Sequence, residues 1–178
     1  AELNGIKSPS FFGKYEKTIV NAGLSKAYRL PGLRIGWTVG PKDYIKKAWA
    51  FHDYTSISIA YHSDWVASRI LDTKRRKQIL DGTKQHLNQN MNTLVEWIDT
   101  CNGKLSLSPP QAGAIAFVRI KMDIPSQDLT YHIRDKFSVL LTAGKWFGLE
   151  GFLRFGYGPP NEYLLEALER IGQSLEAV

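Results

Sequence analysis

Lys26 is the side chain in this sequence that most plainly offers chemistry. The apolar residues 18–20 precede it, so we expect the lysine to follow a buried strand. Loss of water lowers the pKa of an amine, and a neutral amine is a nucleophile that forms Schiff bases with carbonyl groups. The position therefore predicts a lysine that binds a carbonyl compound covalently, although a strand-end lysine taken alone is an ordinary surface residue.

Arg34 follows eight positions later and is flanked by Gly32 and Gly36. Glycines let the backbone approach a ligand closely, and a planar guanidinium can bind phosphate through two parallel hydrogen bonds. An imine-forming lysine beside a phosphate-binding arginine is the combination that pyridoxal 5′-phosphate (PLP) requires. The pair therefore predicts a PLP site.

The whole run of residues 23–37 resembles the cofactor-lysine motif of the class I and II (fold-type I) aminotransferases. In that family a small residue precedes the lysine, here Ser25, and a Gly-x-Arg-x-Gly stretch closes the motif, here residues 32–36. The resemblance implies that Lys26 is catalytic and binds PLP. It also implies that Ser25 and Arg34 contact the cofactor.

Two positions depart from the family pattern. Gly23 stands where many members have a serine that helps to hold the phosphate, so that hydroxyl contact is absent. Arg29 stands where small or apolar residues are usual. We expect both departures to alter the shape of the local pocket.

Arg154 lies in an apolar stretch, residues 151–158. An arginine in an apolar strand is costly unless it is paired, so its partner is either a permanent carboxylate or one that arrives with a substrate. In the aminotransferases an arginine in this context, shortly before the last helix, binds the α-carboxylate of the amino acid. The resemblance assigns that role to Arg154.

Two further stretches resemble family loops. Residues 109–114 resemble a Pro-x-x-Gly loop, and residues 142–148 resemble a Pro-Gly-x-x-Phe-Gly loop in which Ala143 replaces the proline. The family's aspartate and tyrosine that contact the cofactor ring lie upstream of the lysine strand, and nothing before Lys26 matches them. We therefore expect this chain to be the C-terminal portion of a longer protein and to be inactive alone.

The composition bounds the class of protein. The chain has 178 residues, of which 43% are hydrophobic and 22% charged, as in globular proteins. It has no apolar run that could span a bilayer and no signal-peptide pattern at its start. Its single cysteine, Cys101, excludes an intrachain disulfide and favours a cytoplasmic location. The four histidines lack metal-ligand spacing, so no metal is expected.

The net charge is +6, from 23 basic and 17 acidic residues. The densest basic run, residues 74–77, could contact nucleic acid, but few aromatic residues accompany it. A solvated helix face is the interpretation that we favour. A basic pocket would also suit an anionic cofactor and carboxylate substrates.

Apolar periodicity predicts a long helix over residues 72–100 and a last helix that begins after residues 159–161. Ser126 is expected to cap another helix. Other helices are expected to begin at Pro41 and near Asp64, and residues 52–63 are expected to form a loop. Strands are expected at residues 17–21, 33–39, 104–107, 114–120, 139–142 and 152–155.

These elements predict an α/β chain in two parts. Residues 1–63 would be a remnant of a PLP-binding large domain that carries the Schiff-base lysine, with its edge strands. Residues 64–178 would be a C-terminal α+β small domain with helices packed on a small sheet.

The function that this sequence predicts is that of a PLP-dependent aminotransferase. The whole protein would be a homodimer that moves an amino group between an amino acid, aspartate-like by default, and a 2-oxo acid. No nucleic acid, membrane or metal partner is expected. Two alternatives stay open: a PLP-dependent lyase of the same fold, and a non-catalytic aminotransferase-like effector domain of a transcriptional regulator.

Overall fold

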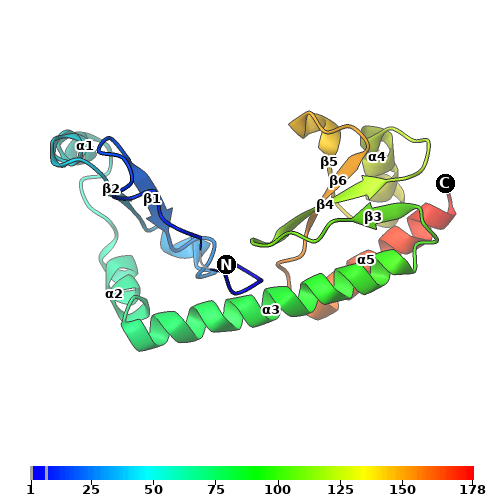
Figure 1. Cartoon of the computed structure of the whole chain (residues 1–178), viewed down its shortest axis with the longest axis horizontal. Helices are drawn as coiled ribbons and strands as arrows, with labels where there is room; N and C mark the ends of the chain where they lie inside the picture. Colours follow the sequence, from blue (N-terminus) through cyan, green and yellow to red (C-terminus); the bar gives the residue numbers. More distant parts are fainter. Residues whose placement is uncertain (1, 7) are drawn as a thin grey trace. The chain divides into compact units, whose positions relative to one another are not determined.

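The computed structural model describes residues 2–6 and 8–178. The chain forms two compact units, Ala1–Thr83 and Lys84–Val178, which meet within one long helix (Figure 1). The domain boundary expected between residues 63 and 64 stays a prediction about the whole protein. No helix in the described part of the chain is long and apolar enough to cross a membrane.

The first unit is built on an antiparallel ribbon of β1 (Val20–Gly23) and β2 (Gly36–Val39). The turn that carries Lys26 and the short 3₁₀ helix η1 (Pro31–Leu33) connect β1 to β2. Helices α1 (Lys42–Thr55) and α2 (Tyr61–Ile70) follow.

The first unit corrects three of the predicted boundaries. The first strand starts later than residue 17, because the amide of Thr18 is used in a turn to Tyr15 O at 3.1 Å. The second starts later than residue 33, because Pro31 begins η1 and Arg34 then adopts a left-handed conformation. The loop expected over residues 52–63 is shorter, because α1 continues to Thr55 and α2 already begins at Tyr61.

A small core lies beneath the Lys26 turn. Leu24, Tyr28 and Ala67 are buried, and apolar residues of η1, α2 and the next helix pack around them. The strands themselves are not buried, since the residues of β1 are half-buried or exposed and every residue of β2 is exposed. The prediction of a buried strand before Lys26 is therefore wrong for this chain, because the described residues do not cover the faces of the two-stranded ribbon.

Helix α3 (Thr73–Asp99) confirms the long helix that was predicted. Its apolar residues serve two cores. Ile79 and Leu80 pack on the core of the first unit, whereas the second unit buries a stripe made of Leu87, Met91, Leu94 and Ile98. The helix ends before Asn102 and Gly103, whose φ angles are 50° and 74°, as expected for an Asn-Gly stop.

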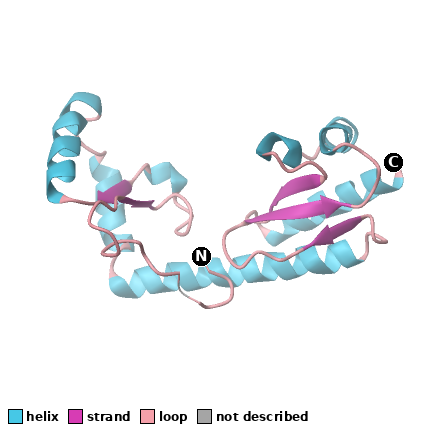
Figure 2. Cartoon of the chain, turned by 45° about the horizontal axis from the view of Figure 1, so that its top comes forward, coloured by secondary structure: helices cyan, strands magenta, loops and turns pink. Residues whose placement is uncertain are grey.

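The second unit is a four-stranded antiparallel sheet in the order β3-β4-β6-β5. Its strands are β3 (Leu105–Leu107), β4 (Ile115–Ile120), β5 (Thr142–Ala143) and β6 (Phe152–Gly156). Figure 2 shows α3 and α5 (Asn161–Glu176) lying along one side of this sheet. Alternate residues such as Val118 and Leu153 are fully buried there, which leaves Phe117 and Arg154 on the opposite, more open face.

The strand predicted over residues 139–142 is wrong except at Thr142, because β5 has only two residues, Thr142 and Ala143. Helix α4 (Ser126–Phe137) ends at Ser138, which takes a left-handed conformation with φ 58°. The following residues have no strand beside them until Thr142 reaches its partner Arg154 in β6. An apolar run alone cannot reveal that a partner strand is missing.

A buried asparagine fixes the connection between β6 and α5. Asn90 of α3 is completely buried and donates hydrogen bonds to Tyr157 O at 2.8 Å and Pro159 O at 2.7 Å. Its own carbonyl accepts a hydrogen bond from Asn161 at 3.1 Å. Since these buried polar groups satisfy one another, the connection has one preferred conformation.

The start of α4 is held by a carboxylate and not by the expected serine cap. Pro125 occupies the cap position, and Ser126 is the first helical residue. The carboxylate of Glu150 accepts hydrogen bonds from Ser126 N at 2.7 Å, Ser126 Oγ at 3.2 Å and Gly151 N at 3.0 Å. A negative charge is favourable at a helix N-terminus, so Glu150 supplies what a local cap would otherwise provide.

We expect this contact to make stability pH-dependent. The amides of Ser126 and Gly151 hold the pKa of the Glu150 carboxyl below its ordinary value of 4.5. A group whose pKa is lowered by folding adds stability above its ordinary pKa, and this stability is lost as the pH falls through the folded-state value. Thermal unfolding between pH 7 and pH 3 should therefore show a smaller loss of melting temperature in Glu150→Gln than in the wild type. Parallel losses in the two proteins would contradict the assignment.

Candidate active site

The Lys26 turn is a short loop closed by backbone hydrogen bonds. Arg29 N donates to Lys26 O at 2.9 Å, and Leu30 N donates to Leu24 O at 3.0 Å. Leu24 and Tyr28 point into the small core on either side of the lysine. The two buried neighbours hold the turn, so that the exposed Lys26 side chain lies on its outer surface.

One side-chain hydrogen bond ties this turn to α3. Arg76 Nε donates to the Tyr28 hydroxyl at 2.9 Å, and the contact is partly buried. Arg76 belongs to the basic run at residues 74–77 that was interpreted as a solvated helix face. All four residues of the run are exposed, as that interpretation requires, and Arg76 in addition holds the residue two positions after Lys26.

The structure brings three predicted site residues to one hollow. Ser25, Lys26 and Arg34 line a hollow of about 620 Å³ together with residues of both ribbon strands. We call it the lysine hollow; its other lining residues are Asn21, Ala22, Gly23, Ala27, Ile35 and Gly36. An amine, a hydroxyl and a guanidinium therefore share one concave surface.

Arg34 is held in an unusual backbone conformation. Its φ and ψ angles are 55° and 37°, in the left-handed region that non-glycine residues seldom adopt. Its Nη1 donates to Pro31 O at 2.8 Å, which secures one end of the guanidinium. A guanidinium has five N–H donors, so the others stay available for an anion.

Arg29 also has a left-handed backbone, with φ 57°. Only glycine takes this conformation without strain, so Arg29 adds backbone strain to the turn. The side chain of Arg29 is exposed, and the residue is not among those that line the lysine hollow. The departure at Arg29 thus affects backbone strain more than the surface of the hollow.

Arg154 lies in the second unit, on β6, directly opposite Phe117 of β4 and Thr142 of β5. It is half-buried, and no carboxylate in the described part of the chain pairs with it. Its Cζ atom instead lies 6.0 Å from the centre of the Phe147 ring. A permanent carboxylate partner, one of the two possibilities that the sequence left open, is therefore absent among these residues.

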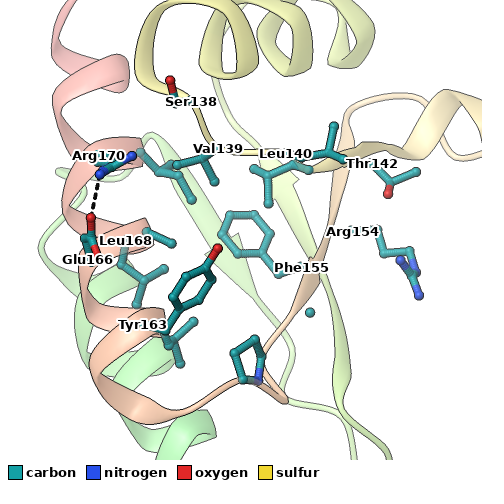
Figure 3. A pocket seen from close by; sticks show the side chains of 16 residues that line it. Ser138, Val139, Leu140, Thr142, Arg154, Phe155, Tyr163, Glu166, Leu168 and Arg170 are labelled. Atoms are coloured by element: carbon teal, nitrogen blue, oxygen red, sulfur yellow. Dashed lines mark hydrogen bonds and ion pairs between the residues drawn. The ribbon is translucent and has the colours of Figure 1, made fainter. Parts of the chain in front are cut away.

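A second hollow of about 550 Å³ borders Arg154, between α5 and the segment 138–142. Figure 3 shows that the Arg154 guanidinium is directed away from Phe155 and Tyr163, which occupy the middle of this hollow. The arginine therefore contributes its functional group to the open face of the sheet and not to the middle of this hollow.

Sequence reasoning missed several residues that shape these sites. Asn21 lines the lysine hollow and accepts a hydrogen bond from Thr38 Oγ1 at 2.6 Å across the ribbon. Their strand positions carry no motif that could have revealed the pair. The contact of Arg76 with Tyr28 spans 48 positions, which local spacing cannot reveal. No group of histidine, cysteine or acidic residues that could hold a metal occurs within the described residues.

Comparison with protein families matches residues 3–171 to the aminotransferase class I and II model. Capreomycidine synthase of Streptomyces vinaceus is 28% identical over 85% of this chain and 39% of its own length. An aspartate aminotransferase of Pyrococcus horikoshii is 25% identical over 90% of this chain and 42% of its own.

The fold agrees with a solved structure as well. A PLP-dependent aminotransferase from Streptococcus suis superimposes with a TM-score of 0.90 and 30% identity, over 99% of this chain and 46% of that one. The α/β fold class predicted from sequence is thereby confirmed. In all three comparisons the chain spans less than half the length of the protein that it matches.

We expect that the serine common at position 23 in the family cannot simply be restored here. A Cβ atom on Gly23 would lie 2.9 Å from Ile35 O and 3.3 Å from Gly36 Cα, both backbone atoms. Gly23→Ser must push the two strands apart, which should lower the free energy of unfolding by about 1–3 kcal/mol. Urea unfolding measures this effect, with Ala22→Ser as a control that adds a hydroxyl at the exposed neighbouring position. A Gly23→Ser protein as stable as this control would show that the ribbon tolerates the side chain.

Proposed function

Because this chain belongs to the class I and II aminotransferase family, we propose that the whole protein is a PLP-dependent aminotransferase. The observation that carries the proposal is the shared lining of the lysine hollow by Ser25, Lys26 and Arg34. The first is a small hydroxyl donor, the second a primary amine and the third a guanidinium beside glycines. Together they meet the needs of a cofactor that has both an aldehyde and a phosphate group.

Family members use PLP, and the donor set of the hollow fits it. When bound, PLP supplies an electron sink for reactions at the substrate's Cα. Lys26 Nζ would hold the aldehyde carbon and, once the substrate's amine has displaced it, take and return the Cα proton as a general base. The Arg34 guanidinium and the Ser25 hydroxyl would bind the phosphate.

The distribution of charge supports an anionic ligand in the first unit. Residues 1–83 contain 14 basic and 7 acidic residues, whereas residues 84–178 contain 9 and 10. The whole excess of positive charge therefore belongs to the unit that has the lysine hollow. Such a field attracts phosphate-bearing ligands from solution.

Arg154 would bind the α-carboxylate of the amino acid and of the 2-oxo acid. The absence of a carboxylate beside it among the described residues supports this assignment, since an unpaired guanidinium on a strand can receive a partner from a ligand. An aspartate-like amino donor is the default, as in the relative from Pyrococcus horikoshii that is named aspartate aminotransferase.

A homodimer and a cytoplasmic location complete the proposal. Helices α1 and α2 expose large aromatic side chains, among them Trp49, Phe51, Tyr54, Tyr61 and Trp65. An accumulation of exposed aromatic residues is typical of surfaces that other protein elements cover. The cytoplasmic location rests on the single cysteine of the sequence.

Selective labelling tests the cofactor assignment. We expect PLP followed by borohydride reduction to modify Lys26 in the 178-residue chain, and mass spectrometry identifies the modified lysine. Arg34→Ala should lower the apparent affinity for this labelling about tenfold, because it removes a charge-assisted contact with phosphate. Arg29→Ala is the matched control, since this neighbouring arginine does not line the hollow. Equal losses in the two variants, or labelling spread over many lysines, would contradict the assignment.

Turnover by the whole protein tests the reaction. Lys26→Ala should abolish transamination, because no other amine lines the lysine hollow among the described residues. The exposed Lys42→Ala serves as the control. Transaminase activity that survives in Lys26→Ala would overturn the mechanism. The 178-residue chain alone should not exceed the rate of free PLP.

Product analysis separates the remaining alternatives. An aminotransferase consumes a 2-oxo acid for each amino acid converted, whereas a PLP-dependent lyase releases ammonia or a thiol without consuming one. A DNA-binding domain encoded upstream, together with no turnover, would instead identify an effector domain of a transcriptional regulator.

A further inference from the structure

We infer that Phe147 is a positioning residue whose ring holds the guanidinium of Arg154 ready for a carboxylate. The inference rests on the function proposed above and deepens it. It also gives a role to the loop at residues 142–148, which resembles a loop of the aminotransferase family.

Three side chains form a small cluster on the open face of the second sheet. Arg154 Cζ lies 6.0 Å from the centre of the Phe147 ring, within the range of a cation–π contact. The Phe147 ring meets Phe117 edge to face, with centres 5.6 Å apart and planes at 87°. Phe117 in turn lies directly opposite Arg154 in the β4–β6 ladder. Each member of the cluster therefore restricts the other two.

Phe147 does not fill the core. The residue is 52% exposed, so burial of apolar surface does not fully account for its place. An aromatic ring beside a guanidinium restrains the group without using its N–H donors. Those donors stay free for a carboxylate, which Arg154 lacks among the described residues.

The loop places the ring by a tight backbone turn. Phe147 ends the 3₁₀ helix η2 (Gly144–Phe147). Gly144 is buried so closely that a Cβ atom would lie 2.2 Å from Leu149 O. Gly148 has φ 72° and its amide donates to Lys145 O at 3.0 Å. Only glycine fits at position 144, and glycine takes the conformation at position 148 without strain, so the turn has little freedom to move the ring.

A hydrogen-bond chain anchors this turn to α4. Lys145 N donates to Ser126 Oγ at 3.3 Å, and that hydroxyl donates to the Glu150 carboxylate at 3.2 Å. Ser126 is completely buried. The start of α4 thereby holds η2, and η2 holds the ring against Arg154.

The first experiment tests the contact without reference to function. In the isotopically labelled 178-residue chain, NMR signals of the Arg154 δ-methylene and Nε–H groups are assigned by comparison with Arg154→Lys. Phe147→Leu should move them toward the positions of an arginine free of ring-current shifts, whereas Phe147→Tyr should preserve them. Trp146→Leu is the matched control, because this neighbouring ring contacts Tyr131 instead, at 6.4 Å. Unchanged Arg154 signals in a folded Phe147→Leu chain would overturn the inference.

The second experiment measures the consequence for binding, with propionate as the carboxylate probe. Titration followed on the Arg154 signals should give an affinity roughly threefold to tenfold weaker in Phe147→Leu than in the wild type, the range expected for a cation–π contact. Phe147→Tyr should restore the affinity. In the whole PLP-loaded protein, KM for the amino donor should rise by a similar factor while kcat changes little.

The outcomes distinguish the inference from the proposal beneath it. If Phe147→Leu shifts the Arg154 signals but leaves propionate affinity and KM unchanged, the ring is near Arg154 without positioning it, and the inference is wrong. If the wild-type chain shows no propionate-dependent change at Arg154, the assignment of Arg154 to carboxylate binding fails, and the inference fails with it. Weaker binding that Phe147→Tyr rescues would support both.

Discussion

The direct pairing of Gly23 with Gly36 is the constraint on which the first unit depends. A Cβ atom would lie 2.9 Å from Ile35 O if added to Gly23 and 2.9 Å from Ala22 O if added to Gly36, so glycine alone permits this approach without a shift of the backbone. The ribbon ends at this pair. The chain continues from Gly23 to Lys26 and returns from Arg34 to Gly36. The amine and the guanidinium reach the same hollow because the backbone closes there.

The residues between these glycines convert the close approach into a fixed turn. Leu24 and Tyr28 bury their side chains in the small core, while Arg29 and Arg34 both take left-handed backbone conformations. Strained residues persist only where the surroundings determine them strongly. Here the buried neighbours and the closing hydrogen bonds provide that determination. The length and fixed spacing of the motif therefore have a physical basis. For this reason the sequence alone could indicate that Ser25, Lys26 and Arg34 would line one surface.

Other features could not be predicted from local sequence. The long helix α3 was predictable because its apolar residues recur on one face and an Asn-Gly pair ends it. The start of α4 was not, because the group that satisfies its first amide is Glu150, 24 positions away. The exposure of the strand before Lys26 was also not predicted, because an apolar run indicates which residues form a strand but not whether another element covers them. Likewise, nothing local to Phe147 indicates that Arg154 lies beside it.

Helix α3 connects the two candidate sites through contacts at different points along its length. Near its start, Arg76 donates to the hydroxyl of Tyr28, two positions from the reactive lysine. Farther along, Asn90 donates to the two carbonyls that follow the strand of Arg154. Both asparagine contacts are buried or partly buried, and unmade hydrogen bonds there would be costly. The Arg76 contact belongs to the first unit and the Asn90 contacts belong to the second. Within the first unit α3 restrains the turn of the residue proposed to hold the cofactor, and within the second unit it restrains the end of the strand proposed to hold the substrate.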